Sequence, residues 1–147
     1  MIDVDTERAK LITKALFKGH VDKGGNNYFD SHLKVVAGLV EEWGYGKDYI
    51  ITGYLHDMLE DIKIIKYEYL KTSFGIAVAD AVRVLTKTEN IDYDVYLEEI
   101  KKNPIARIVK LADMTNNSDL KRIPSPTEKD FKRVVKYKKG IEFLNAN

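Results

Sequence analysis

The chain has 147 residues, enough for one domain that buries about two thirds of its unfolded-chain surface. Its 24 basic and 23 acidic residues leave a net charge of +1, which favours neither nucleic acid nor an anionic membrane as a partner. It has no cysteine, which excludes disulfides, iron–sulfur clusters and thiolate zinc sites. Any metal must therefore bind to His, Asp or Glu.

The start of the chain is acidic and lacks an apolar signal core. No stretch approaches the roughly 20 consecutive apolar residues that a membrane span requires. We therefore expect a cytoplasmic protein without a membrane partner. The sequence leaves the oligomeric state open.

Apolar residues recur at helical spacing along nearly the whole chain, and no alternating β pattern of useful length is present. Glycine-rich and proline-containing breaks separate the helical segments. Helices are predicted at residues 5–19, 32–43, 48–61, 66–72, 76–87 and 93–102. A further helix is predicted to begin at residue 104, and the last is predicted to follow Thr127 and run to about residue 145. Asp30 or Ser31 is expected to cap the second helix. The prediction is an all-α globule of about eight helices, with residues 1–147 in a single domain.

The run from His56 to Asp61 is the most informative segment. At about 100° per residue, His56, Asp57, Glu60 and Asp61 lie on one side of a helix and apolar residues on the other. Carboxylates at a helix C-terminus are disfavoured by roughly 0.3–1 kcal/mol each, and a bound cation would remove that conflict. Gly53, one turn earlier, is interpreted as leaving space for the ion. The alternative is a solvated acidic helix end.

A second cluster lies at Lys110–Asn117, where Asp113 and Asn117 share a helical face. Asp113 follows an apolar run, so its carboxylate needs a partner. The alternative is a surface pair with Lys110. His32 begins a helix, where a neutral imidazole ligand is tolerated better than a charged ring. The alternative there is an exposed histidine near the helix cap.

Together these residues could form a nitrogen–oxygen metal site with positions left for water or phosphate. A metal would lower the pKa of bound water to roughly 7. Glu60 and Asp61 would then be free to orient that water or to move protons.

The ordered set resembles the HD-domain metal-dependent phosphohydrolases, which carry a separated His, an adjacent His-Asp pair and a distal Asp. It is similar in particular to the RelA/SpoT-type alarmone hydrolases. These have Glu-Asp one turn after His-Asp, as in His56–Asp61, and Lys-Leu-Ala-Asp followed by Asn, as in Lys110–Asn117. The glycine-rich segment before Tyr28 and His32 is similar to their substrate loop. The resemblance covers about residues 9–145.

The resemblance implies an all-α HD domain that binds Mn²⁺ and removes the 3′-pyrophosphate of (p)ppGpp, giving GDP and pyrophosphate. The implied metal ligands are His32, His56, Asp57 and Asp113. The implied catalytic pair, which positions and deprotonates water, is Glu60 and Asp61. The implied substrate-binding residues are Lys23, Tyr28 and Asn117.

The chain departs from the family in its substrate loop. Tyr28 lies four residues before His32, whereas the alarmone hydrolases have a tyrosine three residues before the histidine. Two alternatives to alarmone hydrolysis remain. One is an HD-type phosphatase or phosphodiesterase for another nucleotide. The other is a non-catalytic HD module that binds nucleotide or a protein partner.

Two further features allow either a binding or a packing interpretation. The last helix is rich in lysine, but its apolar residues, among them Phe131, Val135 and Leu144, predict a core stripe with the cations on the solvated face. Tyr93 and Tyr96 could stack on a nucleotide, although core packing is expected for at least one of them.

Overall fold

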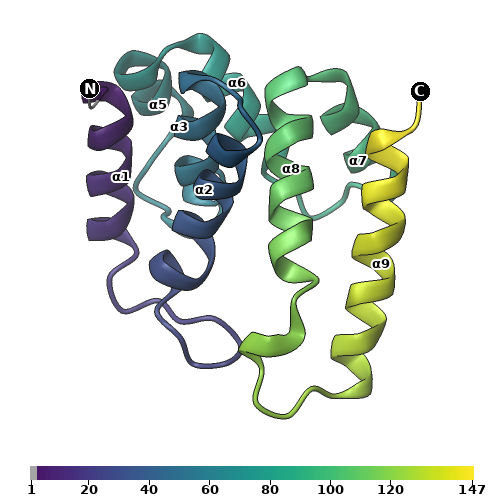
Figure 1. Cartoon of the computed structure of the whole chain (residues 1–147). Coiled ribbons are helices and arrows are strands. Elements are labelled where there is room, and N and C mark those ends of the chain that lie inside the picture. The colour runs from purple at the N-terminus through teal and green to yellow at the C-terminus, as the bar shows by residue number, and fades with distance from the viewer. Residues whose placement is uncertain (1–2) are drawn as a thin grey trace.

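The computed structural model describes residues 3–147, and its ribbon is helical apart from turns and one isolated bridge between Val21 and Asn27 (Figure 1). The all-α prediction is confirmed. The elements in chain order are α1 (Val4–Leu16), η1 (Phe29–Leu33), α2 (Lys34–Glu42), α3 (Lys47–Leu55), α4 (Met58–Asp61), α5 (Tyr67–Phe74), α6 (Ile76–Leu85), α7 (Tyr93–Lys102), α8 (Pro104–Asn117), η2 (Leu120–Arg122) and α9 (Glu128–Asn145). Here η1 is a π-helix and η2 a 3₁₀ turn. None of the described helices is long and apolar enough to cross a membrane.

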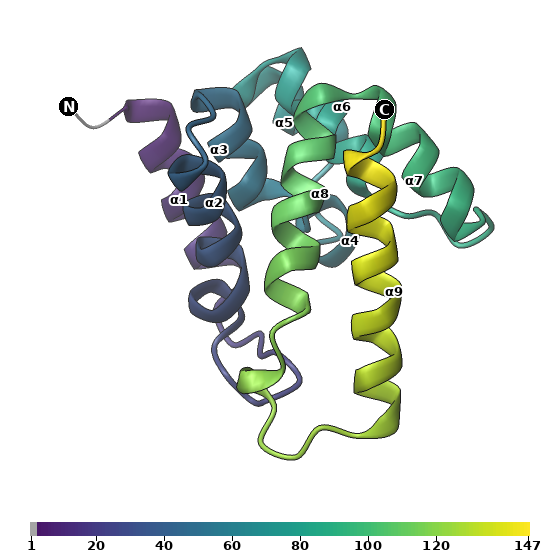
Figure 2. The ribbon, with the colours of Figure 1, turned by 45° about the vertical axis from the view of Figure 1, so that its right-hand side comes forward.

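Two apolar clusters form the core. One joins α1, η1, α3 and α4 to α5 and α6, and the other joins α2 and α6 to α7, α8 and α9. Helix α8 lies between α2 and α9, as Figures 1 and 2 both show. Leu33 and Leu55 belong to the first cluster and Ala112 to the second. The candidate site residues next to them in sequence therefore lie where the two clusters meet.

Local sequence signals explain several helix ends. The Asn103 side chain accepts a hydrogen bond from the backbone N–H of Ala106 at 3.0 Å, and Pro104 occupies the first turn, where a missing N–H costs nothing. Thr127 and Asp130 form a reciprocal capping box at the start of α9. Both predicted helix starts are confirmed.

The predicted continuous helix over residues 48–61 is wrong. Helix α3 ends at Leu55 and α4 begins at Met58. The His56 ring donates from Nδ1 to the carbonyl of Gly53 at 2.7 Å and so competes for an acceptor of the helical ladder. Gly53 also has a different role from the one expected. A Cβ there would lie 2.9 Å from Cα of Ala37, so the glycine permits close packing of α2 and α3 rather than space for an ion.

The interpretation of α9 needs a similar correction. Leu144 is buried, but Phe131 and Val135 are each 54% exposed. The helix packs on α8 and α7 through only part of its apolar surface, and Val135 lines an open cavity between α7 and α9. The sequence pattern overestimated the width of the buried face.

Candidate metal centre

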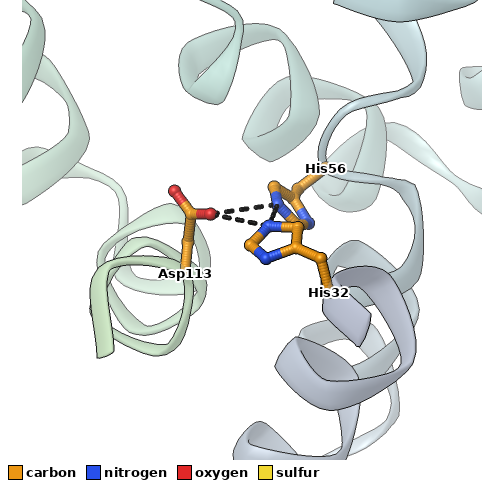
Figure 3. Close-up of side chains that lie close together, drawn as sticks. All are labelled: His32, His56 and Asp113. Carbon is orange, nitrogen blue, oxygen red and sulfur yellow. Dashed lines mark hydrogen bonds and ion pairs between the residues drawn. The ribbon is translucent and has the colours of Figure 1, made fainter. Parts of the chain in front are cut away.

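Three buried side chains from distant parts of the chain point toward one another (Figure 3). His32 comes from η1, His56 from the residue after α3, and Asp113 from the third turn of α8. Nε2 of His32 lies 2.9 Å from Oδ1 of Asp113, and Nε2 of His56 lies 3.5 Å from the same oxygen. The two Nε2 atoms are 3.2 Å apart. Two imidazoles and one carboxylate thus face a common point.

Asp57 lies at the edge of this group. Its Oδ2 is 3.4 Å from Nε2 of His56 and 3.9 Å from Nε2 of His32. The hydroxyl of Tyr28 donates to the same oxygen at 2.5 Å. The structure therefore brings together all four side chains predicted as metal ligands, with Asp57 nearest the solvent.

The donor atoms fit a divalent ion. Two atoms each about 2.1 Å from one ion lie about 3.0 Å apart at a right angle and about 3.4 Å apart at the tetrahedral angle. The distances among the ring nitrogens and the Asp113 oxygen, 2.9 to 3.5 Å, match that range. A set of imidazole and carboxylate donors suits first-row divalent metals. These residues can hold such a metal without rearrangement of the backbone.

The electrostatics of the centre combine buried charges of both signs. Burial by itself would raise the pKa of Asp113, but Lys110 and the two histidines hold it well below its usual value. The ammonium of Lys110 lies 2.9 Å from Oδ2 of Asp113, and this pairing outweighs burial and raises the lysine pKa. Burial would lower the pKa of His56, but Asp57 and Asp113 raise it to about 9. A metal at this point would replace a proton.

Glu60 and Asp61 lie on α4, next to Asp57. Asp57, Glu60 and Asp61 each offer one carboxylate oxygen, and these three oxygens lie within 4.8 Å of one another. Partial burial and then the charge of Asp57 raise the pKa of both acids above their usual values. Both are exposed, unlike the three buried ligands. Carboxylates at this position could accept a proton from a water molecule beside the buried group without themselves binding the metal.

Two cavities adjoin the site. The metal-side cavity, about 290 Å³, is lined by His56, Asp57, Glu60, Asp113 and three lysines, Lys87, Lys110 and Lys136. The loop-side cavity, about 280 Å³, is lined by three cations, two acids and apolar side chains; the charged residues are Lys23, Arg122, Arg133, Asp22 and Asp130. Three residues line both: Tyr28, Asn117 and Tyr137. A ligand could therefore extend from one cavity to the other past the metal centre.

The glycine-rich loop that carries Lys23 is held by its neighbour Asp22. Oδ1 of Asp22 accepts backbone hydrogen bonds from Gly24 and Asn26, each at 2.9 Å. Arg122 pairs with Oδ2 of Asp22 at 3.3 Å. A Cβ on Gly24 would overlap the carbonyl oxygen of Arg122, so only glycine permits this approach. The exposed Lys23 side chain thus extends from a loop anchored on both sides.

The π-helix η1 lies between Tyr28 and Lys34, where the chain departs from the family spacing. The backbone N–H of Lys34 donates to the carbonyl of Phe29, five residues earlier. A π turn accommodates one more residue than an α turn. The helical segment begins at Phe29, before both residues, so the predicted cap at Asp30 or Ser31 is wrong. His32 is buried within this turn. The π turn can accommodate the extra residue before His32, and the Tyr28 hydroxyl donates a hydrogen bond to Asp57.

Asn117, predicted to bind substrate, lies at the end of α8 between the two cavities. Its Nδ2 donates to Oδ1 of Asp113 at 3.2 Å, and its Oδ1 accepts from Arg122 at 3.4 Å. The sequence did not single out Arg122. It also did not single out Asn116, the residue before Asn117, whose buried amide contacts the His32 ring. The only signal for Asn116 was its position three residues after Asp113, one helical turn away.

The tyrosines of α7 divide as expected. Tyr96 is buried and donates to the carbonyl of Leu85 at 2.5 Å, so it is a core residue. Tyr93 is half-buried in the metal-side cavity, with the Lys136 ammonium 4.0 Å from its ring centre. Tyr93 therefore lines the cavity beside Lys136, and its ring centre lies 6.2 Å from that of Tyr96.

Comparison with known proteins agrees with this geometry. The HD domain family matches residues 9–135. A probable guanosine-3′,5′-bis(diphosphate) 3′-pyrophosphohydrolase of Synechocystis is 29% identical over 136 residues, 85% of this chain and 17% of the relative. A GTP pyrophosphokinase of Myxococcus xanthus is 31% identical over 125 residues, 76% of this chain and 16% of the relative. The chain thus spans about one sixth of the length of these relatives.

A solved structure described as a metazoan ortholog of SpoT, which hydrolyses ppGpp and has a role in starvation responses, superposes with a TM-score of 0.82. The match is 18% identical and covers 99% of this chain and 88% of the other. At this identity the match establishes the fold.

The chain belongs to the HD domain family, and its buried group of two histidines and one aspartate offers the donor atoms of a divalent metal site. Within that family it resembles the RelA/SpoT-type ppGpp hydrolases.

Proposed function

We propose that the chain is a guanosine-3′,5′-bis(diphosphate) 3′-pyrophosphohydrolase that releases GDP and pyrophosphate. The observation that carries the proposal is the buried His32–His56–Asp113 group, which adjoins a cavity lined by three lysines. The family match and the ppGpp hydrolase among the relatives support the same reaction class. The proposal extends to residues 1–147 as a single HD domain, with a cytoplasmic location as expected from the sequence.

The proposed ion is Mn²⁺, held by His32, His56, Asp57 and Asp113. When bound, it would lower the pKa of water and neutralise developing charge on phosphate. Lys110 keeps Asp113 ionised, and Tyr28 fixes the second carboxylate through its hydrogen bond to Asp57. These two contacts orient both of the proposed carboxylate ligands.

Glu60 and Asp61 are proposed to orient the attacking water and accept its proton. Their raised pKa values bring them closer to neutral pH, which favours proton transfer. Because both side chains are exposed, the proton can pass on to solvent. Attack at the phosphorus of the 3′-pyrophosphate breaks the bond to the ribose 3′ oxygen, which leaves with a proton.

The substrate is proposed to lie across both cavities. Lys87 and Lys136 form no ion pair in the described residues, so both can neutralise phosphate in the metal-side cavity. In the loop-side cavity, Arg122 and Arg133 are already paired with Asp22 and Asp130. Among the described cations that line that cavity, Lys23 has no ion pair, and Tyr28 and Asn117 are proposed to contact the nucleotide between the two cavities.

The test is turnover of ppGpp by the EDTA-treated protein with and without Mn²⁺, followed by ³¹P NMR. Release of pyrophosphate with GDP, dependent on Mn²⁺ and absent in Asp57→Ala, is the expected result. Asp80→Ala, which removes a half-buried carboxylate on α6 paired with Arg83, is the matched control and should retain full activity. GTP, GDP and cyclic dinucleotides complete the panel. Turnover of one of these instead of ppGpp would reject the proposed substrate, and full activity of Asp57→Ala would reject the site.

A further inference from the structure

The two histidines of the centre are held by different kinds of partner. Nδ1 of His56 faces the carbonyl of Gly53 at 2.7 Å. A carbonyl can only accept, so Nδ1 carries a proton, and Nε2 presents a lone pair to a metal once the ring is neutral. Nδ1 of His32 faces Nδ2 of Asn116 at 2.8 Å instead. An amide can donate through its nitrogen or accept through its oxygen.

The orientation of the Asn116 amide is set by a second contact. Nδ2 also donates to the backbone carbonyl of Ser31 at 3.1 Å, where the amide oxygen would face another oxygen. Each hydrogen of the amide nitrogen therefore has its own acceptor. Nδ1 of His32 accepts one of them, which places the ring proton on Nε2, 2.9 Å from Asp113. Asn116 is only 8% exposed, so no solvent competes for these bonds.

This arrangement occupies the atom that a metal needs. A metal ligated through Nε2 requires the proton on Nδ1, and that proton requires an acceptor. Rotation of the Asn116 amide by half a turn supplies the acceptor, because its oxygen then faces Nδ1. We infer that Asn116 is a positioning residue that holds His32 in opposite tautomers in the empty and metal-loaded centre. The inference rests on the proposed metal role of His32.

The consequence is a difference between the two ligands. His56 is ready for metal in its neutral form, whereas His32 must exchange a proton and lose the amide contact to Ser31. Asn116 therefore weakens metal binding relative to a partner that only accepts. A carboxylate in place of the Asn116 amide would keep the His32 proton on Nδ1 both with and without metal. An apolar side chain there would stabilise neither tautomer of His32.

The first experiment reads the tautomer directly in the full chain. Two-bond ¹H–¹⁵N spectra of histidine-labelled protein are recorded without metal and with Zn²⁺, a diamagnetic substitute. The expected result is Nε2–H for His32 without metal and Nδ1–H with Zn²⁺, while His56 keeps Nδ1–H throughout. A proton on Nδ1 of His32 in the empty protein would overturn the inference.

The second experiment measures Mn²⁺ affinity by calorimetry. Asn116→Leu is expected to bind about 10–100-fold more weakly than the wild type, the range for residues that orient a ligand. Asn116→Asp is expected to bind at least as tightly as the wild type. Thr115→Ala, which removes an exposed hydroxyl bonded only within α8, is the control and should be unchanged.

A folded Asn116→Leu with wild-type affinity, or an Asn116→Asp weakened tenfold, would overturn the role of Asn116 and leave the metal centre intact. A wild-type protein that binds neither Mn²⁺ nor Zn²⁺ would overturn the metal centre itself. If Asn116→Leu fails to fold, the spectra of the wild type and the Asp variant still decide between these outcomes.

Discussion

The buried ligands and the exposed acids of α4 are neighbours, yet they are built in opposite ways. His32, His56 and Asp113 are at most 7% exposed, and each has a polar partner behind it. Glu60 and Asp61 are exposed and lie in a helix of four residues. Groups that hold an ion benefit from fixed geometry, whereas groups that move protons benefit from contact with solvent. The difference supports the proposal that the first set holds the metal and the second transfers protons.

The largest expected effect comes from breaking the buried set at Asp113. Asp113→Ala should lose bound metal and turnover together and should lower the free energy of unfolding by about 3–5 kcal/mol. The stability cost arises because Lys110, whose side chain is 14% exposed, would lose its carboxylate partner. Metal analysis, a turnover assay and urea unfolding measure the three quantities.

Asp113→Ala with Lys110→Met is the informative comparison, since the buried cation is removed as well. The double variant should recover much of the stability but none of the metal or activity. Unchanged stability of Asp113→Ala would mean that Lys110 does not depend on the pair.

The exposed set should behave differently when Glu60 is replaced. Glu60→Gln is expected to keep the metal and the fold and to lose about 10²–10⁴-fold in kcat, because the side chain can no longer accept a proton. Calorimetry of Mn²⁺ binding and steady-state kinetics separate the two effects. Glu68→Gln, an exposed acid on α5, is the matched control. Loss of metal in Glu60→Gln would move this residue from the exposed set to the ligands.

The sequence predicted the fold and the set of side chains that converge, but not the local contacts that hold them. The helical spacing predicted the all-α fold, and the order of His32, His56-Asp57 and Asp113 indicated which side chains converge. The break between α3 and α4 was not predictable from periodicity, because it involves a side-chain bond to the Gly53 carbonyl. The partner of His32 was hidden for another reason. Asn116 lies 84 residues away, and only the packing of α8 on η1 brings the two together.

A smaller effect is expected at Tyr28, which lies between the two sets. Tyr28→Phe removes the hydroxyl that donates to Asp57 at 2.5 Å and leaves the ring in place against Phe17 and His32. Mn²⁺ affinity should fall about tenfold, because the carboxylate is then less well oriented. The ring packing predicts an unchanged melting temperature. Calorimetry and thermal unfolding provide the two readouts, and wild-type affinity would show that packing alone orients Asp57.

The smallest effect is expected in the loop, where Lys23 is exposed and Asp22 is not. Lys23→Ala should raise KM about two- to fivefold and leave kcat and metal affinity unchanged, since a screened surface charge contributes about 1 kcal/mol or less. The effect should shrink as salt is added, because screening weakens attraction between an exposed lysine and phosphate. Lys18→Ala, in the exposed turn that follows α1, is the matched control. A large loss of kcat in Lys23→Ala would mean that the loop closes onto the reacting phosphate, and the loop would then belong with the catalytic acids rather than with substrate capture.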